Sequence, residues 1–300
     1  MAEDTINRIQ RLKGEKNAVI LAHNYQPPHI QDIADMCGDS LELSVRASKT
    51  EAGVIVFCGV RFMAETASVL CPGKTVLLPA QGAGCPMADM ITEAQLAEWR
   101  SRFTDIPVIA YVNSSAAVKA NADICCTSAN SIQVAESLSA DEALLVPDRN
   151  LARYTDAKSG KTVHAWNGYC PYHEHLSLNT VRKKRREHPD ALFMAHPECR
   201  TEVLETADKV ASTSGMLAFA RSSDAKSFIV GTEVGLLYPL QKACPDKFFV
   251  AASEKMECVD MKKIGLETVA ACLENLYGVV RVPEHIREPA MKAVQKMISI

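Results

Sequence analysis

Three cysteines stand at matching places in the sequence and could bind a metal centre. Cys85, Cys170 and Cys258 each follow an apolar, strand-like run and precede a polar segment, and they are separated by 85 and 88 residues. Nearly equal spacing at matching places indicates one structural unit used three times. Thiolates favour zinc or iron–sulfur clusters as partners. Three converging thiols would leave one coordination position open, on a zinc ion or on a [4Fe–4S] cluster, which four cysteines normally hold.

The other cysteines point to a different role. The chain contains eleven, with no C-x-x-C pair, and this argues against zinc ribbons and thioredoxin-like chemistry. We expect Cys58, Cys125 and Cys126, which lie in strand-like runs, to be small buried hydrophobic residues. The three spaced cysteines instead precede expected helices, whose positive N-terminal ends favour the thiolate, so we expect their pKa values to be lowered.

Polar residues follow the apolar runs in a second repeated pattern. The runs 17–22, 107–110 and 191–195 are continuous and apolar, which is typical of buried parallel strands. They lead into His23-Asn24-Tyr25, Tyr111-Val112-Asn113 and His196-Pro197-Glu198. Ligands of parallel sheets bind beyond the carboxyl ends of the strands. The sequence therefore predicts that these side chains face one ligand site.

Hydroxyl residues at expected helix starts form a third set. Its members are Ser40, Ser128, Ser212 and Thr213. Such residues hold anions together with backbone N–H groups, or they only cap the helix. His173 follows Cys170 by three residues and could face the same cavity or lie on the surface of the first helical turn.

These repeats divide the chain into three units. The first covers 1–86 and is completed by C-terminal helices within 259–300, the second covers 87–171, and the third covers 172–258. Each unit reads as strands alternating with helices, so the predicted fold is α/β, with three similar parallel-sheet sandwich domains about a pseudo-threefold axis and an active site at their junction. The alternative is three tandem α/β domains with unrelated loops, and the matching polar residues argue against it.

The composition sets the broad class of protein. Of 300 residues, 47% are hydrophobic and 23% are charged, as in ordinary globular proteins. The formal net charge of −3 predicts neither a nucleic-acid nor a membrane partner, and we interpret the basic run 182–186 as a solvated helix face. The N-terminal segment lacks a signal peptide's apolar region, and no apolar run could span a bilayer. We expect a cytoplasmic protein.

Several motifs occur together in an order that resembles one known family. They are His23-Asn24-Tyr25-Gln26, Gly84-Cys85-Pro86-Met87-Ala88-Asp89, Gly168-Tyr169-Cys170-Pro171-Tyr172-His173, His196-Pro197-Glu198-Cys199, Ser212-Thr213-Ser214-Gly215-Met216, Gly231-Thr232-Glu233 and Met256-Glu257-Cys258-Val259-Asp260-Met261-Lys262-Lys263. Together they resemble quinolinate synthase, over about residues 18 to 265.

The resemblance implies a reaction and a cofactor. Quinolinate synthases condense iminoaspartate with dihydroxyacetone phosphate to quinolinate, the precursor of the NAD pyridine ring, and release phosphate and water. They hold a [4Fe–4S] cluster through one cysteine from each of three domains, which correspond here to Cys85, Cys170 and Cys258. The partners expected are therefore these small molecules, together with a functional link to an enzyme that produces iminoaspartate.

The resemblance also implies roles for single residues. Tyr25 matches the family's catalytic tyrosine and would move protons, while His23 would help to position the triose. Glu198 and His196 would form an acid–base pair, and His173 would face the cavity. The residues expected to hold carboxylates are Tyr111, Asn113, Ser40, Ser212 and Thr213. Ser128 would help to hold the phosphate.

Two other readings remain open at this point. One is a different lyase or hydro-lyase that uses a three-cysteine cluster or zinc. The other is a cluster-containing sensor of redox state or of a metabolite, which would need no proton-transfer tyrosine.

Overall fold

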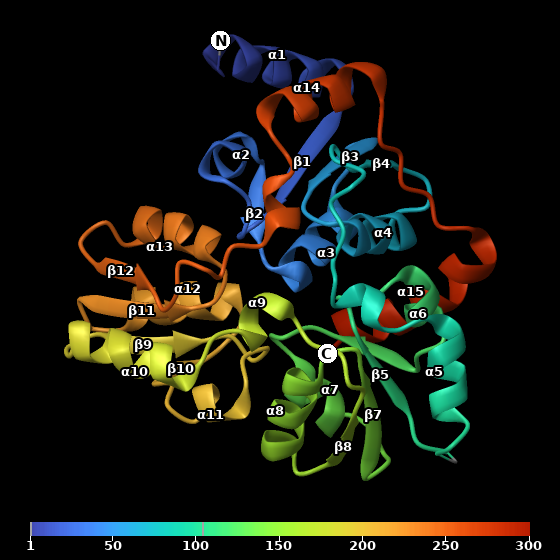
Figure 1. The fold of residues 1–300 in the computed structure, drawn as a ribbon. Helices are drawn as coiled ribbons and strands as arrows, with labels where there is room; N and C mark the ends of the chain where they lie inside the picture. Colours follow the sequence, from blue (N-terminus) through green and yellow to red (C-terminus); the bar gives the residue numbers. More distant parts are fainter. Residues whose placement is uncertain (1, 104) are drawn as a thin grey trace.

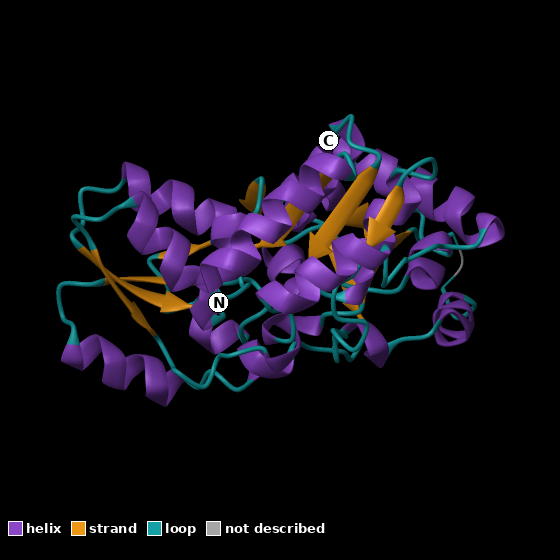
Figure 2. Ribbon diagram, turned by 90° about the horizontal axis from the view of Figure 1, so that it is seen from above, coloured by secondary structure: helices purple, strands orange, loops and turns teal. Residues whose placement is uncertain are grey.

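Three parallel sheets form the framework of the molecule. A computed structural model describes residues 2–103 and 105–300. Among these residues are three four-stranded parallel sheets with equivalent strand orders, β2-β1-β3-β4, β6-β5-β7-β8 and β10-β9-β11-β12. Figure 1 shows the three units arranged around a common centre, and Figure 2 shows helices lying over the strands. The predicted fold class of three similar parallel-sheet domains is confirmed.

The elements follow one another along the chain in the alternation that the sequence predicts. The strands are β1 (Ala18–His23), β2 (Met36–Gly38), β3 (Val54–Cys58), β4 (Thr75–Leu77), β5 (Val108–Tyr111), β6 (Ile124–Cys126), β7 (Glu142–Val146), β8 (Thr162–Ala165), β9 (Leu192–Ala195), β10 (Lys209–Val210), β11 (Ser227–Gly231) and β12 (Phe248–Ala251). The helices are α1 (Ala2–Glu15), α2 (Pro28–Ile33), α3 (Ser40–Lys49), α4 (Arg61–Leu70), η1 (Ala88–Met90), α5 (Glu93–Arg100), α6 (Ala116–Ala120), α7 (Ser131–Glu136), α8 (Arg149–Ser159), α9 (Pro171–Glu174), α10 (Leu178–Glu187), α11 (Thr201–Leu204), α12 (Thr213–Ser222), η2 (Val234–Leu236), α13 (Leu237–Ala243), η3 (Val259–Lys262), α14 (Leu266–Asn275) and α15 (Glu284–Ile298).

The central strands of the sheets are buried on both faces, whereas edge strands such as β8 and β12 are partly exposed. The central strands β3 and β11 are almost wholly buried, which explains their continuous apolar sequences. The cysteines in strands follow the same rule, since Cys58, Cys125 and Cys126 are all buried. Their predicted role as small core residues is confirmed.

An aspartate clamp recurs in every unit. The carboxylates of Asp35, Asp123 and Asp208 accept hydrogen bonds from strand N–H groups 15 residues earlier in the chain, at 2.7–2.8 Å. Each aspartate N–H also donates to the carbonyl oxygen of that same strand residue. The clamp fixes where the second strand of each unit runs beside the first. It therefore sets the same register at the start of all three units.

The C-terminal helices do not all complete the first unit. Helix α14 lies beside α1, as expected for a helix of the first unit (Figure 1). Helix α15 instead packs on α6 and β6 of the second unit and on α4 of the first. Its Ala293, Val294 and Met297 belong to the core of the second unit. The expectation that the whole segment 259–300 completes the first unit is therefore wrong for α15, whose apolar face bridges two units.

Candidate active site

One cavity lies where the three units meet. Its walls carry every residue that the sequence analysis placed in the site except Ser212. These residues are His23, Tyr25, Ser40, Cys85, Tyr111, Asn113, Ser128, Cys170, His173, His196, Glu198, Thr213 and Cys258. The carboxyl ends of parallel strands deliver most of them, as expected for this sheet type.

The three first strands present their polar ends in the same way. At the ends of β1, β5 and β9, the first and third residues of each polar triplet line the cavity. The middle residues, Asn24, Val112 and Pro197, are buried elsewhere. At the ends of β1 and β9 the chain forms a tight turn, in which the N–H of Gln26 donates to the His23 carbonyl oxygen and that of Cys199 to the His196 carbonyl oxygen. Each unit thus contributes two neighbouring side chains from one short stretch of backbone.

Backbone contacts fix the tautomers of two histidines. His23 Nδ1 accepts the N–H of Tyr25 at 3.2 Å, and His196 Nδ1 accepts the N–H of Glu198 at 3.3 Å. A neutral imidazole that accepts at Nδ1 carries its proton at Nε2. His196 Nε2 lies 3.1 Å from Ser128 Oγ and therefore donates to it. His23 likewise keeps an N–H donor at Nε2.

Glu198 is the hub of the cavity. Its Oε1 accepts hydrogen bonds from the Tyr111 hydroxyl at 2.7 Å and from Asn113 Nδ2 at 3.3 Å. Its Oε2 lies 2.9 Å from His173 Nδ1 and 3.8 Å from His196 Nδ1. One carboxylate thus joins side chains from the second and third units.

A hydrogen-bonded chain runs from this hub to Tyr25. His173 Nδ1 donates to Glu198, so its Nε2 accepts from Thr232 Oγ1, 2.8 Å away. Thr232 Oγ1 in turn lies 2.5 Å from the Tyr25 hydroxyl and accepts from it. The chain Tyr25–Thr232–His173–Glu198 can carry a proton between the phenol and the imidazole.

Burial sets the charge states of these groups. Burial lowers the pKa of both His23 and His196 from 6.5 to about 3, so both are neutral at neutral pH. Burial also raises the pKa of Tyr25 well above 10, with the charge of Glu198 adding to the effect, which keeps the phenol protonated. Burial raises the pKa of Glu198 as well, but neighbouring histidines and hydrogen bonds outweigh it and bring the value to about 2.

The three cysteines come from three units and face the same cavity. Cys170 is the N-cap residue of α9, Cys258 that of η3, and Cys85 precedes η1. All three are partly exposed free thiols. Burial raises the pKa of each thiol, that of Cys85 to about 12, although backbone N–H groups act in the opposite direction. The expectation of lowered pKa values is therefore wrong, because desolvation outweighs the helix ends.

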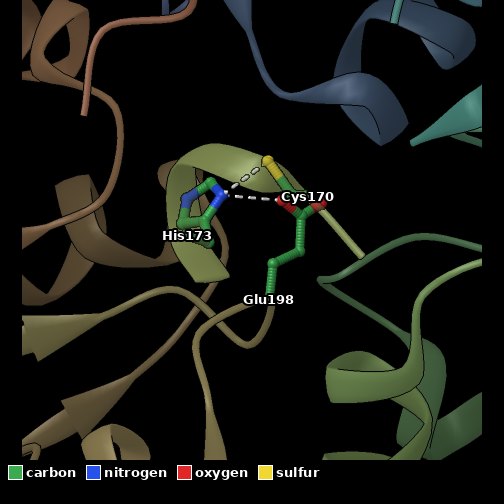
Figure 3. A group of neighbouring side chains, drawn as sticks. All are labelled: Cys170, His173 and Glu198. Carbon is green, nitrogen blue, oxygen red and sulfur yellow. Dashed lines mark hydrogen bonds and ion pairs between the residues drawn. The ribbon is translucent and has the colours of Figure 1, made fainter. Parts of the chain in front are cut away.

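A smaller group at one wall could also hold an ion. The ligand atoms of Cys170, His173 and Glu198 lie within 4.8 Å of one another. Figure 3 shows His173 Nδ1 pointing at both partners, 3.2 Å from Cys170 Sγ and 2.9 Å from Glu198 Oε2. His173 therefore connects the cysteine end of the cavity to the acid–base end, and it lies in the cavity rather than on the surface.

The hydroxyl residues at helix starts do not all behave alike. Ser40 and Thr213 line the cavity, and Thr213 Oγ1 also accepts from Asn24 Nδ2 at 2.9 Å. Ser212 caps α12 by accepting the N–H of Gly215. Its own hydroxyl donates to Asp39 Oδ2 at 3.0 Å. Ser212 thus reaches the cavity through Asp39.

Sequence reasoning missed several polar residues of the site. Thr232 belongs to the motif Gly231-Thr232-Glu233 but was not predicted as a site residue, yet it links Tyr25 to His173. Glu233 lines the cavity, pairs with Lys262 at 2.8 Å and accepts the N–H of Cys258 at 3.0 Å. Asp39 lines it too, as the N-cap of α3. The place of Thr232 and Glu233 at the end of the apolar run 227–231 was the available signal.

None of the helices in the described part of the chain has the length and apolar character needed to cross a bilayer.

Comparison with known proteins shows the family to which the chain belongs. A family model described as Quinolinate synthetase A protein matches residues 7–299. The chain belongs to the quinolinate synthase family. Quinolinate synthase of Geotalea uraniireducens is 52% identical over 301 residues, covering 100% of this chain and 99% of that protein. Quinolinate synthase 1 of Methanosarcina acetivorans is 50% identical over 297 residues, covering 99% and 98%. The family's enzymes are named for forming quinolinate, and the resemblance seen in the sequence motifs is confirmed.

Proposed function

We propose that the chain condenses iminoaspartate with dihydroxyacetone phosphate to quinolinate, with release of phosphate and two waters, as a step toward the NAD pyridine ring. Family membership supports the product. The observation that carries the proposal is one cavity that joins a thiol from each unit to a protonated tyrosine on a relay. Iminoaspartate would come from an enzyme that oxidises the amine of aspartate, acting in the same cytoplasmic compartment.

The cofactor proposed is a [4Fe–4S] cluster on Cys85, Cys170 and Cys258. The residues fit such a group, because each unit supplies one free thiol to a shared cavity. Raised thiol pKa values do not oppose it, since a bound metal ion itself deprotonates a coordinating thiol. When bound, the cluster supplies an open iron that polarises substrate oxygens for loss of water.

Tyr25 would move protons at the substrate. As it takes a proton from a substrate carbon or hydroxyl, its own proton passes to Thr232, and the Thr232 proton passes to His173 Nε2. The imidazolium that forms lies against the ionised Glu198, which stabilises it. The reverse transfer returns a proton to a leaving hydroxyl. The same chain thus serves isomerisation, condensation and dehydration as general acid and base.

The other polar residues would bind and orient the substrates. His196 Nε2–H donates to Ser128 Oγ, so the Ser128 hydroxyl would donate in turn to the phosphate or a leaving hydroxyl. The Nε2–H of neutral His23 would hold the triose. Carboxylates would be held by residues of all three units, namely Ser40, Tyr111, Asn113 and Thr213. Ser212 donates its hydroxyl to Asp39 and would orient that side chain.

One observation favours a second candidate, a zinc hydro-lyase. Cys170, His173 and Glu198 are close enough together to bind a single ion, and three protein ligands with one open position are typical of catalytic zinc. This site would leave Cys85 and Cys258 without a role. A cluster-containing sensor is the third candidate, and it leaves the proton relay without a role.

Metal analysis of protein purified without oxygen tests the proposal. We expect about four irons and about four sulfides per chain, with the metal lost in C85S, C170S and C258S. The matched control is C37S, since Cys37 is also a partly exposed thiol but lies outside the cavity. Zinc that survives C85S but not C170S would establish the single-ion site instead.

An assay for quinolinate then separates enzyme from sensor. The wild-type protein with its full iron content should convert the two substrates to quinolinate, and Y25F should keep the iron but lose the activity. A wild-type protein that holds four irons yet forms no quinolinate would overturn the proposed function.

A further inference from the structure

The first turn of helix α8 contacts the backbone of Glu198 from outside the cavity. Asn150, the second residue of α8, is 1% exposed and lies outside the cavity lining. We infer that Asn150 is a positioning residue that holds the Glu198 backbone where its carboxylate meets His173 and Tyr111. The inference rests on the proposed function, because it assigns Asn150 to the geometry of that same site.

Both amide hydrogens of Asn150 are committed. Its Nδ2 donates to the carbonyl oxygen of Glu198 at 2.9 Å and to Glu174 Oε2 at 2.9 Å. Turning the amide over would aim its oxygen at two acceptors, so these partners fix its orientation. Asn150 thus connects α8 of the second unit to the turn that carries Glu198 in the third.

Glu174 holds the Asn150 side chain in place from α9. It is the last residue of α9, the helix that Cys170 caps. Its Oε1 accepts from Arg149 Nη2 at 2.6 Å, while Oε2 takes the Asn150 amide. Arg149 also donates through Nη1 to Asn167 Oδ1 at 2.9 Å. The loop that carries Cys170 and the turn that carries Glu198 are therefore tied to the same two residues of α8.

The contact completes a two-point hold on Glu198. The N–H of Glu198 donates to His196 Nδ1, and its carbonyl oxygen accepts from Asn150. With both backbone groups fixed, the side chain leaves the turn in one direction, toward His173 and Tyr111. Removing the Asn150 donor would free the carbonyl end of this turn and let the carboxylate move.

Asn150 is not needed to start its helix. Asp148 Oδ1 caps α8 by accepting the N–H groups of Asn150 and Leu151 at 2.7 and 2.8 Å. The Asn150 side chain adds nothing to that cap. Among the described residues, its Oδ1 is buried without a partner, an unfavourable state. The two hydrogen bonds that the amide donates therefore account for an asparagine at this position.

A charge-conserving swap separates positioning from simple structural support. In N150D/E174Q the acid moves from position 174 to position 150, where the helix N-terminus favours it. The amide introduced at position 174 can donate to the carboxylate introduced at position 150, which restores that bond. The new carboxylate, however, has no proton for the Glu198 carbonyl. The variants to compare are N150A, this swap, and T155V as a control. Thr155 is buried on the same helix, and within the described part of the chain its hydroxyl bonds only to Ser131 and Leu151.

We expect N150A to keep its iron and lose roughly tenfold to hundredfold in kcat, with KM changed by less than about threefold, as for a small misplacement of a catalytic group. T155V should melt at a lower temperature with unchanged kcat. The swap should restore part of the melting temperature lost in N150A but not the kcat of wild type, because the carboxylate at position 150 faces the Glu198 carbonyl oxygen without a proton. Wild-type kcat in N150A, activity lost only in proportion to iron, or kcat restored by the swap would each overturn the inference.

A readout independent of activity keeps this test separate from the proposed function. In a crystal structure of the swap variant, we expect the distance from Glu198 Oε2 to His173 Nδ1 to exceed about 3.5 Å, the limit of a hydrogen bond. An unchanged contact would overturn the role of Asn150 even if the enzyme forms quinolinate. A wild-type protein without activity would refute the proposed function, while the displaced carboxylate would still support the inference.

Discussion

The ends of β1 and β9 use one backbone device for two kinds of chemistry. In both, a histidine stands at the end of the strand, His23 as the last residue of β1 and His196 directly after β9, and its Nδ1 accepts the N–H of the residue two positions later. That third residue is a phenol in the first unit, Tyr25, and a carboxylate in the third, Glu198. The two ends of the proton relay are therefore equivalent positions of a repeated fold, joined through Thr232 and His173.

The end of β5 shows what happens without the histidine. Tyr111 stands at the first position, and its carbonyl oxygen accepts from Ser114 Oγ at 2.7 Å. Its hydroxyl and the Asn113 amide both donate to Glu198. The second unit thus contributes hydrogen-bond donors rather than an acid–base pair. A repeated fold supplies equivalent backbone positions, and the side chain at each position decides its task.

The strongest test of this comparison removes one tyrosine hydroxyl at the end of β1 and one at the end of β5. Y25F takes away the phenol that we propose moves protons at the substrate, so we expect kcat to fall by about a thousandfold or more, within about the range for general acid–base groups. Y111F removes one of several contacts to Glu198, and we expect a loss of about tenfold to hundredfold. Steady-state kinetics per iron-loaded chain measures both losses.

Equal losses in these two variants would contradict the difference between the units. A loss of iron in either would show instead that the hydroxyl supports the metal centre. The iron content of each preparation is therefore the control.

Thr232 tests whether the two equivalent ends work together. T232V keeps the shape of the side chain but breaks the path from Tyr25 to His173, and we expect kcat to fall roughly tenfold to hundredfold. T232S keeps the hydroxyl and should retain most of the activity. Wild-type kcat in T232V would mean that Tyr25 exchanges its proton with water and that the relay has no part in turnover.

Much of this arrangement could be predicted from the sequence, because the repeats are local. The apolar runs before His23, Tyr111 and His196 predicted three strand ends, and the spacing of the cysteines predicted a shared centre. The helices between the repeated strands could be predicted from the sequence in the same way. An apolar run is a property of a short stretch, and the spacing of repeated motifs is counted directly along the chain, so one sequence can reveal both.

The remaining features depend on contacts between distant stretches. Thr232 is 207 residues from Tyr25 and 59 from His173. The motif that contains Thr232 therefore gives no sign that it bonds to either residue. The same holds for Asn150, whose helix-start position predicts only a cap. Helix α15 was assigned to the wrong place because its apolar face fits the second unit as well as the first. The direction of the cysteine pKa shifts required the burial, which a helix start alone does not predict.

The two matched histidines also predict how stability depends on pH. His23 and His196 both have a pKa near 3 in the folded chain, from burial, against 6.5 in the unfolded chain. Between these values only the unfolded chain binds the protons, so the free energy of unfolding falls as pH is lowered from about 7 toward 3. Each histidine contributes up to about 1.4 kcal/mol per pH unit in this window.

Replacing either histidine with asparagine should flatten this dependence. The Asn Oδ1 can accept the same backbone N–H, so H23N and H196N keep the turn and lose the titrating group. Chemical denaturation at a series of pH values should show each variant losing less stability than wild type between about pH 6 and pH 4, with parallel curves above about pH 7, where both histidines are neutral in either state. The ionised Glu198 loses its contribution between about pH 4.5 and pH 2, because its pKa is 4.5 in the unfolded chain and about 2 in the folded chain, so the histidines dominate the change above about pH 4.5. A flattened curve for one variant alone would show that the β1 and β9 ends, although built alike, bury their histidines differently.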